Sequence, residues 1–129
     1  MDHFDEMNEN GWDFEDYEDY EDDAQRVVLC GANSYTQKYY LGDQFSNLPE
    51  AVKQELQIIC VLYVEDVGGI LTMEFNEDGD LELRVAHDPL DYLFDDIGSE
   101  LKIRQIQKEK RELMEQLETY YRIMFLEQG

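Results

Sequence analysis

Residues 69–87, GILTMEFNEDGDLELRVAH, carry the strongest structural signal in the chain. In both flanks of this stretch, residues 69–75 and 81–87, apolar side chains occupy every second position. A period of two is typical of β-strands, because successive side chains point to opposite faces of a sheet. The intervening NEDGD is rich in turn-forming residues. The sequence therefore predicts a β-hairpin.

The turn of this hairpin also resembles a calcium-binding loop. Residues 74–85 carry acidic and amide side chains and a glycine at spacings close to those of an EF-hand. The twelfth position is Val85, where an EF-hand needs a glutamate, and both flanks are strand-like. A hairpin turn is therefore the favoured interpretation.

An α-helix is predicted over residues 47–67, before the hairpin. Asn47 and Glu50 fit a capping box, and Pro49 would lie in the first turn, where its missing N–H costs nothing. Apolar residues recur at steps of three and four, as expected for one face of a helix. These residues are Val52, Leu56, Ile59, Tyr63 and Val67.

The second half of this helix has no polar side. Residues 58–64 read IICVLYV, so they form either a helix that is buried all round or a β-strand. The length of the segment and its regular period favour the helix. Gly68 and Gly69 supply its C-terminal end.

Two further strands are predicted near the start of the domain. Residues 26–31, RVVLCG, are apolar and β-branched, and residues 35–41, YTQKYYL, contain three tyrosines. The intervening GANS has turn-forming composition. We therefore expect the two strands to form a hairpin.

Helical structure is predicted after residue 87. Asp88 and Pro89 resemble a helix start, and apolar side chains up to Ile97 predict one to two helical turns. Ser99 then begins a long helix that continues to about Leu126. Its apolar stripe contains Leu113, Leu117, Tyr120 or Tyr121, and Met124.

The order of these elements, ββαββα, predicts an α+β fold. Its small antiparallel sheet would pack with two main helices. The length of 129 residues is that of one domain, and we assign this domain to residues 25–129. Residues 1–24 precede it as a tail.

The tail differs sharply from the domain in composition. Residues 1–23 hold 12 acids and no Lys or Arg. A segment with so high a charge density and no regular apolar period cannot offset the entropy of ordering, so we expect it to be disordered in isolation. Four aromatic side chains nevertheless lie inside the acidic run WDFEDYEDYEDD at residues 12–23: Trp12, Phe14, Tyr17 and Tyr20.

These rings leave two interpretations of the tail open. The first is a solubilising tail, whose function does not require aromatic rings. A recognition segment would use its charge to steer the encounter and its rings to supply buried area. The second interpretation makes the four rings candidate partner-binding residues, whose target is a basic, groove-bearing surface in a partner or in the same chain.

The chain carries 32 Asp and Glu against 10 Lys and Arg, a formal net charge of -22. Direct binding to nucleic acid or to anionic membranes is disfavoured, because both need a basic face. A basic protein partner is favoured instead. Five of the ten bases lie in the first half of the predicted last helix, where they make one basic patch and a second candidate partner-binding surface: Lys102, Arg104, Lys108, Lys110 and Arg111.

No catalytic centre is evident in the sequence. His87 has no Cys or His at ligand spacing, so a packing or surface role is favoured over a dyad with Cys30 or Cys60. Asp91 and Asp95 could share a helix face, but a solvated face is the favoured interpretation in so acidic a chain. We predict no cofactor, no metal site and no enzyme activity.

The sequence also predicts a cytoplasmic location. It begins without the basic and apolar regions of a signal peptide, and it has no run of about 18 apolar residues that could cross a membrane. Cys30 and Cys60 lie in apolar stretches and are expected to be buried thiols rather than a disulfide.

The segments VLCGANSY, VGGI and DDIGS resemble a small family of uncharacterised clostridial proteins, known as a domain of unknown function. The resemblance covers about residues 27–126 and implies a bacterial cytoplasmic protein, with no particular activity. A hairpin followed by a long helix containing LETYY is also similar, at the level of fold, to type III secretion chaperones. Those proteins are small, acidic and often dimeric, so a homodimer is one assembly that this similarity implies.

We therefore expect a non-enzymatic module, adaptor-like or chaperone-like, that binds a basic protein. The alternative is an immunity protein that neutralises a toxin, or a mimic of nucleic acid. A metal-dependent enzyme that uses carboxylates is a third and weaker hypothesis.

Overall fold

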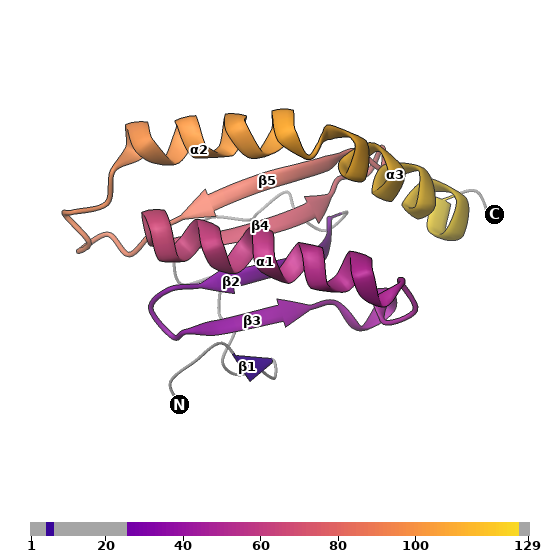
Figure 1. Ribbon diagram of the computed structural model, residues 1–129, viewed down its shortest axis with the longest axis horizontal. Helices are drawn as coiled ribbons and strands as arrows, with labels where there is room; N and C mark the ends of the chain where they lie inside the picture. Colours follow the sequence, from indigo (N-terminus) through magenta and orange to yellow (C-terminus); the bar gives the residue numbers. More distant parts are fainter. Residues whose placement is uncertain (1–4, 7–25, 127–129) are drawn as a thin grey trace.

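The structure is a computed structural model that describes residues 5–6 and 26–126 (Figure 1). The predicted tail, including its four rings, therefore lies almost wholly outside the described residues. The secondary-structure elements in chain order are β1 (Asp5–Glu6), β2 (Val27–Asn33), β3 (Lys38–Leu41), η3 (Asp43–Phe45), α1 (Glu50–Val67), β4 (Ile70–Phe75), β5 (Leu81–Ala86), α2 (Asp96–Glu109), α3 (Arg111–Tyr121) and η4 (Arg122–Leu126).

The five strands form one sheet in the order β1-β3-β2-β4-β5. Strands β2 to β5 pair in antiparallel fashion, and the short β1 pairs in parallel with β3 at one edge. Both predicted hairpins, β2–β3 and β4–β5, are present. The predicted α+β class and the order of its elements are confirmed, with three α-helices in place of two main ones.

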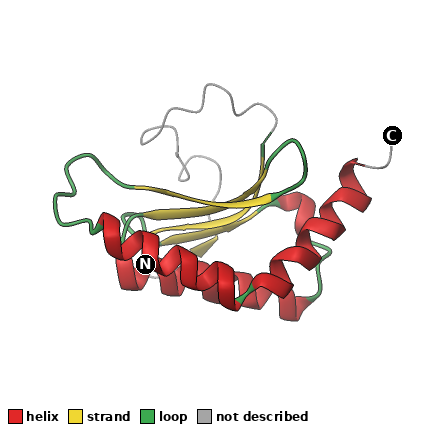
Figure 2. Cartoon of the chain, turned by 90° about the horizontal axis from the view of Figure 1, so that it is seen from above, coloured by secondary structure: helices red, strands yellow, loops and turns green. Residues whose placement is uncertain are grey.

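All three α-helices lie on one face of the sheet (Figure 2). The hydrophobic core fills the space between this face and the helices. From the sheet it receives Leu71, Met73 and Phe75 of β4, and from α1 it receives buried residues of the predicted apolar face, including Leu56 and Tyr63. The ring of Phe75 stacks on Tyr121, with the ring centroids 4.1 Å apart, and joins α3 to this core.

Residues 58–64 are helical, as the length and period of the segment predicted. The α1 helix ends at Gly68 (φ 91°) and Gly69 (φ 74°), where a side chain would be strained. The predicted capping box is wrong, because Pro49 occupies the N-cap position and no side chain caps the helix. Phe45 and Leu48, which precede α1, are buried in the core.

The first hairpin turns later than predicted. Residues of the GANS segment up to Asn33 belong to β2, which pairs with β4 as far as Ile70. The Asn33 side chain accepts hydrogen bonds from the backbone N–H groups of Tyr35 (2.8 Å) and Thr36 (3.2 Å). This local bonding stabilises a turn that begins after Asn33, so β3 is shorter than the predicted strand.

The predicted long helix is also wrong, because it is divided at Lys110 into α2 and α3. No glycine or proline lies near the division. Packing decides it: α2 contacts α1, whereas α3 contacts β5. Residues 88–95 form turns instead of the predicted helical turns, and α2 begins after Asp95, whose carboxylate accepts the N–H of Gly98 at 3.0 Å.

Candidate functional site

A groove of about 410 Å³ runs between α1 and α2. Two ion pairs join its sides. Lys102 Nζ lies 3.2 Å from Asp66 Oδ2, and Lys110 Nζ lies 2.8 Å from Glu55 Oε2. Since the later residue of α1 pairs with the earlier of the two lysines, the helices run antiparallel to each other. The groove is therefore an elongated surface between two packed helices.

The apolar side of the groove comes mainly from α1. Its buried part contains Ile59 and Tyr63, with Ile106 from α2. Its outer part is formed by Ile58 and Leu62, which are 56% and 55% exposed. These two side chains are four residues apart and lie on the same face of the helix. A strip of apolar surface is thus open to solvent along the groove.

A hydrogen bond beneath the groove fixes the two helices to each other. The Tyr63 hydroxyl and the Ser99 Oγ lie 2.5 Å apart, and both residues are buried. Burial raises the pKa of Tyr63, although the bond to Ser99 acts in the opposite direction. The phenol therefore stays neutral and joins α1 to the first turns of α2.

A second exposed surface, the acidic apolar loop, comprises residues 88–97. Its apolar side chains Leu90, Tyr92, Leu93 and Ile97 are exposed, and Leu93 reaches 94% exposure. Four aspartates are interleaved with them: Asp88, Asp91, Asp95 and Asp96. The loop thus combines apolar and acidic groups on one segment next to the start of α2.

Tyr35, in the turn between β2 and β3, holds this loop in place. Its hydroxyl donates to Asp91 Oδ2 at 2.6 Å and accepts the N–H of Asp88 at 3.1 Å. Burial and the hydrogen bond to Asp91 raise the pKa of Tyr35 to about 12. Because this value lies above the ordinary 10.0, the contact contributes fully below pH 10 and is lost as the pH rises through about 12.

Replacing Tyr35 with phenylalanine should therefore loosen the loop and leave the core intact. We expect faster hydrogen exchange at the Asp88 amide, because it loses its acceptor, and a stability loss of at most about 1 kcal/mol. Mass-spectrometric or NMR hydrogen exchange would measure this. Tyr92→Phe is the control, since Tyr92 is 84% exposed. An unchanged Asp88 amide in the Tyr35 variant would contradict the assigned role.

The predicted basic patch is divided between two sides of α2. Lys102 faces α1 and pairs with Asp66, whereas Arg104 pairs with Glu100 at 3.1 Å on the exposed side. Lys108 and Arg111 are exposed, and the division at Lys110 places Arg111 in α3. Trp12, Phe14, Tyr17 and Tyr20 lie outside the described residues, so the structure does not place them relative to these bases.

The residues considered for chemistry have structural roles. His87 stacks on Phe94, with the ring centroids 4.5 Å apart, so its predicted packing role is confirmed. Cys30 and Cys60 are free, buried thiols with their Sγ atoms 3.7 Å apart, as predicted. Within residues 5–6 and 26–126, no group of three or more His, Cys, Asp or Glu side chains is arranged to hold a metal ion.

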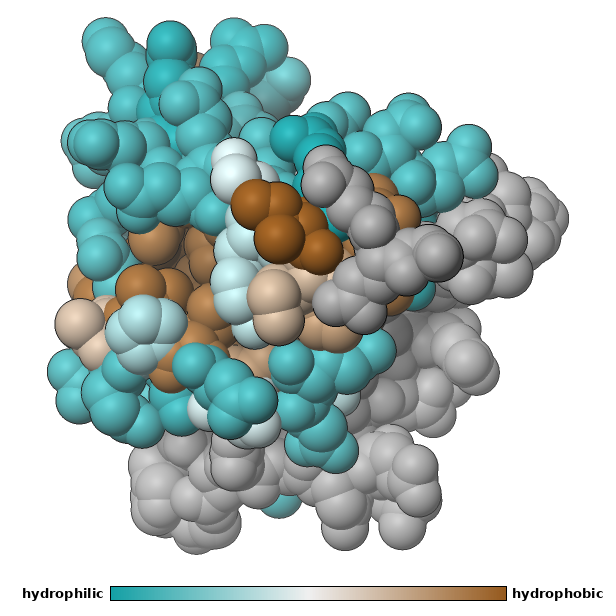
Figure 3. Space-filling view, turned by 90° about the vertical axis from the view of Figure 1, so that its right-hand side faces the viewer, coloured by the Kyte–Doolittle hydropathy of each residue, from teal (hydrophilic) through white to brown (hydrophobic). Residues whose placement is uncertain are grey.

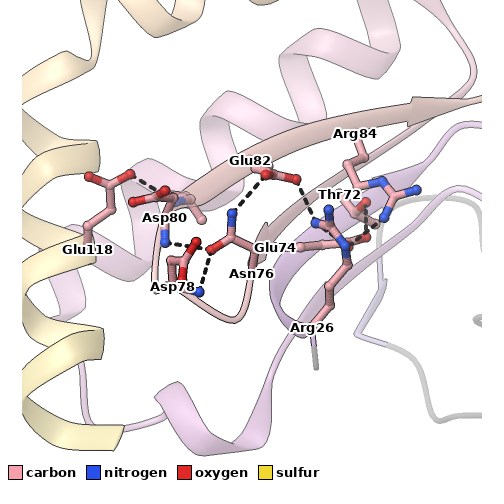
Figure 4. Close-up of polar contacts among 10 residues, drawn as sticks. Arg26, Thr72, Glu74, Asn76, Asp78, Asp80, Glu82, Arg84 and Glu118 are labelled. Atoms are coloured by element: carbon pink, nitrogen blue, oxygen red, sulfur yellow. Dashed lines mark hydrogen bonds and ion pairs between the residues drawn. The ribbon is translucent and has the colours of Figure 1, made fainter. Parts of the chain in front are cut away.

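A polar cluster lies on the other face of the sheet (Figure 4). The carboxylate of Glu74 is 2.8 Å from Thr72 Oγ1 and 3.4 Å from Arg84 Nη1, and Arg26 Nη1 is 2.6 Å from Glu82 Oε1. Burial acts to raise the pKa of Glu82, but its hydrogen bonds with Arg26 and Asn76 lower it overall. These ionised groups compensate one another's charge.

The turn between β4 and β5 is held by the C-terminal helices. Asn76 Oδ1 accepts the N–H groups of Asp78 and Asp80, and Gly79 has a φ of 85°. Arg122 Nη2 bonds Asp80 Oδ1 at 2.5 Å, and Glu118 Oε2 accepts the N–H of Leu81 at 2.8 Å. Asn76, one of the residues in the stretch that resembled a calcium-binding loop, thus stabilises a hairpin turn.

A third exposed surface, after the groove and the acidic apolar loop, lies at the end of the molecule that carries α3 and η4. Figure 3 looks onto this end and shows hydrophobic surface with hydrophilic side chains above and below it. The exposed apolar residues of η4 are Ile123, Met124, Phe125 and Leu126.

Sequence reasoning missed the exposed residues of the groove. Ile58 and Leu62 belong to the all-round apolar segment, which was expected to be buried on every side. The available signal was that residues 58–64 have no polar side. A helix that packs on one face of a sheet turns its other side away from the sheet, so an all-apolar segment of it must expose some apolar residues.

Comparison with known proteins identifies the family of the chain but not its function. The chain belongs to a family of unknown function, DUF6145, whose family model matches residues 26–129. No curated protein and no solved structure matches the chain. Among the described residues, no helix has both the length and the apolar character needed to cross a membrane.

Proposed function

We propose that this chain is a non-enzymatic binding module, adaptor-like or chaperone-like, whose α1–α2 groove binds a basic amphipathic helix of a protein partner. The observation that carries the proposal is the exposure of Ile58 and Leu62 along the groove. Apolar surface that is contiguous and left open on a soluble protein is typical of interaction sites. A third helix is the natural occupant of an elongated apolar groove between two others.

The charges around the groove favour a basic occupant. Its two lysines, Lys102 and Lys110, are already paired with acids of α1. Glu109 lines the groove, and Glu65 lies seven residues after Ile58 on the same side of α1. The excess is therefore negative, in agreement with the formal net charge of -22. Cationic side chains at the border of an amphipathic helix would meet these acids while its apolar side covers Leu62.

The two free thiols also support our proposal of a cytoplasmic location. Cys30 and Cys60 lie close together in the core without a disulfide, which is the usual state of thiols in a reducing compartment.

The binding test uses a synthetic probe of defined chemistry. A fluorescent peptide of Leu and Lys, patterned as an amphipathic helix, is titrated with the full-length chain and followed by anisotropy. We expect salt-sensitive binding that is at least about tenfold weaker for the double variant Ile58→Ser/Leu62→Ser. Because both residues are exposed, the double variant should stay folded, which circular dichroism would verify.

Two controls separate the groove from general charge attraction. Ile123→Ser removes an equally exposed apolar side chain at the other end of the helical layer, and it should bind the probe as the native chain does. A peptide of identical composition, scrambled so that leucines share no face, should bind weakly to every variant. Equal binding of both peptides would contradict the proposal and favour a mimic of nucleic acid that acts through charge alone.

The other occupant that must be considered is a second copy of the chain. Sedimentation of the full-length protein distinguishes it from a partner. A dimer that the Ile58→Ser/Leu62→Ser variant converts to a monomer would show that the groove is covered by another copy, and it would overturn the proposal of a basic partner.

A further inference from the structure

The α2 helix carries a row of charges that is acidic in its first half and basic in its second. Asp96, Glu100, Arg104 and Lys108 follow one another at steps of four residues, so they lie along one side of the helix. All four are exposed, and Arg104 pairs with Glu100 at 3.1 Å within the row. In the opposite direction the row is basic first and acidic second, so it is complementary to itself.

An apolar row lies beside these charges. Ile97 and Leu101 are 73% and 59% exposed, and each follows one of the two acids directly in the sequence. The acidic apolar loop, which leads into α2, adds the exposed side chains of Leu90, Tyr92 and Leu93. Acids at the start of a helix and bases at its end stabilise that helix through its dipole. The dipole does not account for the exposed apolar row, which is typical of an interaction site.

The position of α2 leaves this side of the helix accessible. The helix lies at the border of the helical layer, with α1 along one side (Figure 1). Lys102 and Lys110 of α2 pair with acids of α1, and Ser99 and Ile106 of α2 are buried. With 3.6 residues per turn, the charged row and the apolar row lie on the remaining side, away from α1 and from the core.

Two copies of α2 that pack antiparallel across a twofold axis would match the charged rows to each other. With the axis beside residue 102, Asp96 of one copy lies opposite Lys108 of the other. The same axis places Glu100 opposite Arg104. Both positions therefore join an acid to a base, and the symmetry makes each contact twice.

The same axis also covers the apolar row. The Leu101 side chains of the two copies lie close to the axis, where they can contact each other. The aliphatic stems of the bases in the second half of one row cover Ile97 of the other copy. One arrangement thus uses both rows.

The size of this surface predicts a weak association. The five exposed apolar side chains of the row and the loop provide on the order of 300 Å² of apolar area per copy. With its charged border, a dimer would bury roughly 1,000 Å² in total, which is at the lower limit for specific interfaces. The formal net charge of -22 repels two copies, but charges further apart than about 8 Å are largely screened at physiological ionic strength.

We propose that two copies of this chain associate through the outer side of α2, antiparallel, with Leu101 at the twofold axis and each charged row matched acid to base. The partner that fits this surface is a second copy, because the order of charges is complementary to itself. The interface lies on a different side of α2 from the groove, so this inference is independent of the function proposed for the groove and leaves the groove open.

Sedimentation of the full-length protein at physiological ionic strength tests the interface. We expect a reversible dimer with a dissociation constant on the order of 10–100 µM. Leu101→Ser should raise this constant at least about tenfold. Leu62→Ser is the matched control, since Leu62 is 55% exposed in the groove, and it should leave the dimer unchanged. A native chain that stays monomeric up to about 1 mM would overturn the proposal, as would a dimer that only Leu62→Ser disrupts.

Charge reversal tests the antiparallel arrangement. Asp96→Lys and Lys108→Glu should each weaken the dimer about tenfold, because like charges then face each other twice. An equimolar mixture of the two variants should recover native association, since every contact of the mixed dimer again joins opposite charges. General repulsion predicts the reverse for Asp96→Lys, which lowers the net negative charge. Glu77→Lys makes the same charge change at an exposed position of the β4–β5 turn and should not weaken the dimer. Circular dichroism would verify that the variants fold, and a mixture that associates no better than the separate variants would contradict the proposal.

Discussion

Replacing Phe75 with alanine is expected to lower the free energy of unfolding by about 3–5 kcal/mol. Phe75 is fully buried, and its ring stacks on that of Tyr121. The centroid of the Phe75 ring lies 4.1 Å from that of Tyr121 and 5.7 Å from that of Phe45. It therefore joins β4 to α3 and to η3 at one point. A domain of this size is stable by about 5–15 kcal/mol, so the loss would leave little margin. Urea or thermal denaturation followed by circular dichroism would measure it.

Phe125 supplies a matched control within the same aromatic cluster. Its ring lies 5.6 Å from Phe45 and 5.1 Å from Tyr121, but it is 38% exposed and belongs to η4. Phe125→Ala removes the same atoms with less burial, so we expect a loss of roughly 1 kcal/mol. Similar losses for Phe75 and Phe125 would show that the cluster is not centred on β4, contrary to the structure.

Leu56→Ala is expected to cost about 2–5 kcal/mol, the second largest effect. Leu56 is fully buried on the inner side of α1, where it packs against the sheet. Alanine would leave a cavity that neighbouring side chains fill only partly. The measurement is again the midpoint and slope of denaturant unfolding.

Leu62→Ala is the control on the same helix. Leu62 is 55% exposed, so the same substitution should change stability by only about 0.5 kcal/mol. A large loss at Leu62 would mean that its side chain is buried in solution, by a second copy or by another part of the chain. The pair therefore tests the packing of α1 and also the openness of the groove on which the proposed function depends.

The elements that sequence predicted correctly are those set by local pattern. The β4–β5 hairpin follows from alternation and from the NEDGD turn, where Asn76 and Gly79 supply the local turn geometry. The inner face of α1 follows from apolar residues at steps of three and four, and both Leu56 and Tyr63 are buried as that period requires.

The errors in the last helix depend on contacts between distant residues. No local signal divides the last helix at Lys110; the division arises because α2 packs on α1 while α3 packs on β5. Ser99 was expected to begin that helix, but it is buried inside α2 and bonded to Tyr63, 36 residues earlier. A contact between residues so far apart in sequence produces no local periodic pattern from which it could be predicted.

The sequence by itself determined the α+β class, the two hairpins, the thiol state of the cysteines and the acidity of the chain, and it favoured the helical state of residues 58–64. Periodicity, turn composition and charge are properties of short segments, so they can be identified without knowledge of the fold. Only the tertiary structure decided that Ile58 and Leu62 remain exposed along a groove while Thr72 and Glu74 are buried on the face of the sheet opposite the helices. Burial depends on which elements lie on each side of a residue, and this is fixed only when the helices and strands pack together.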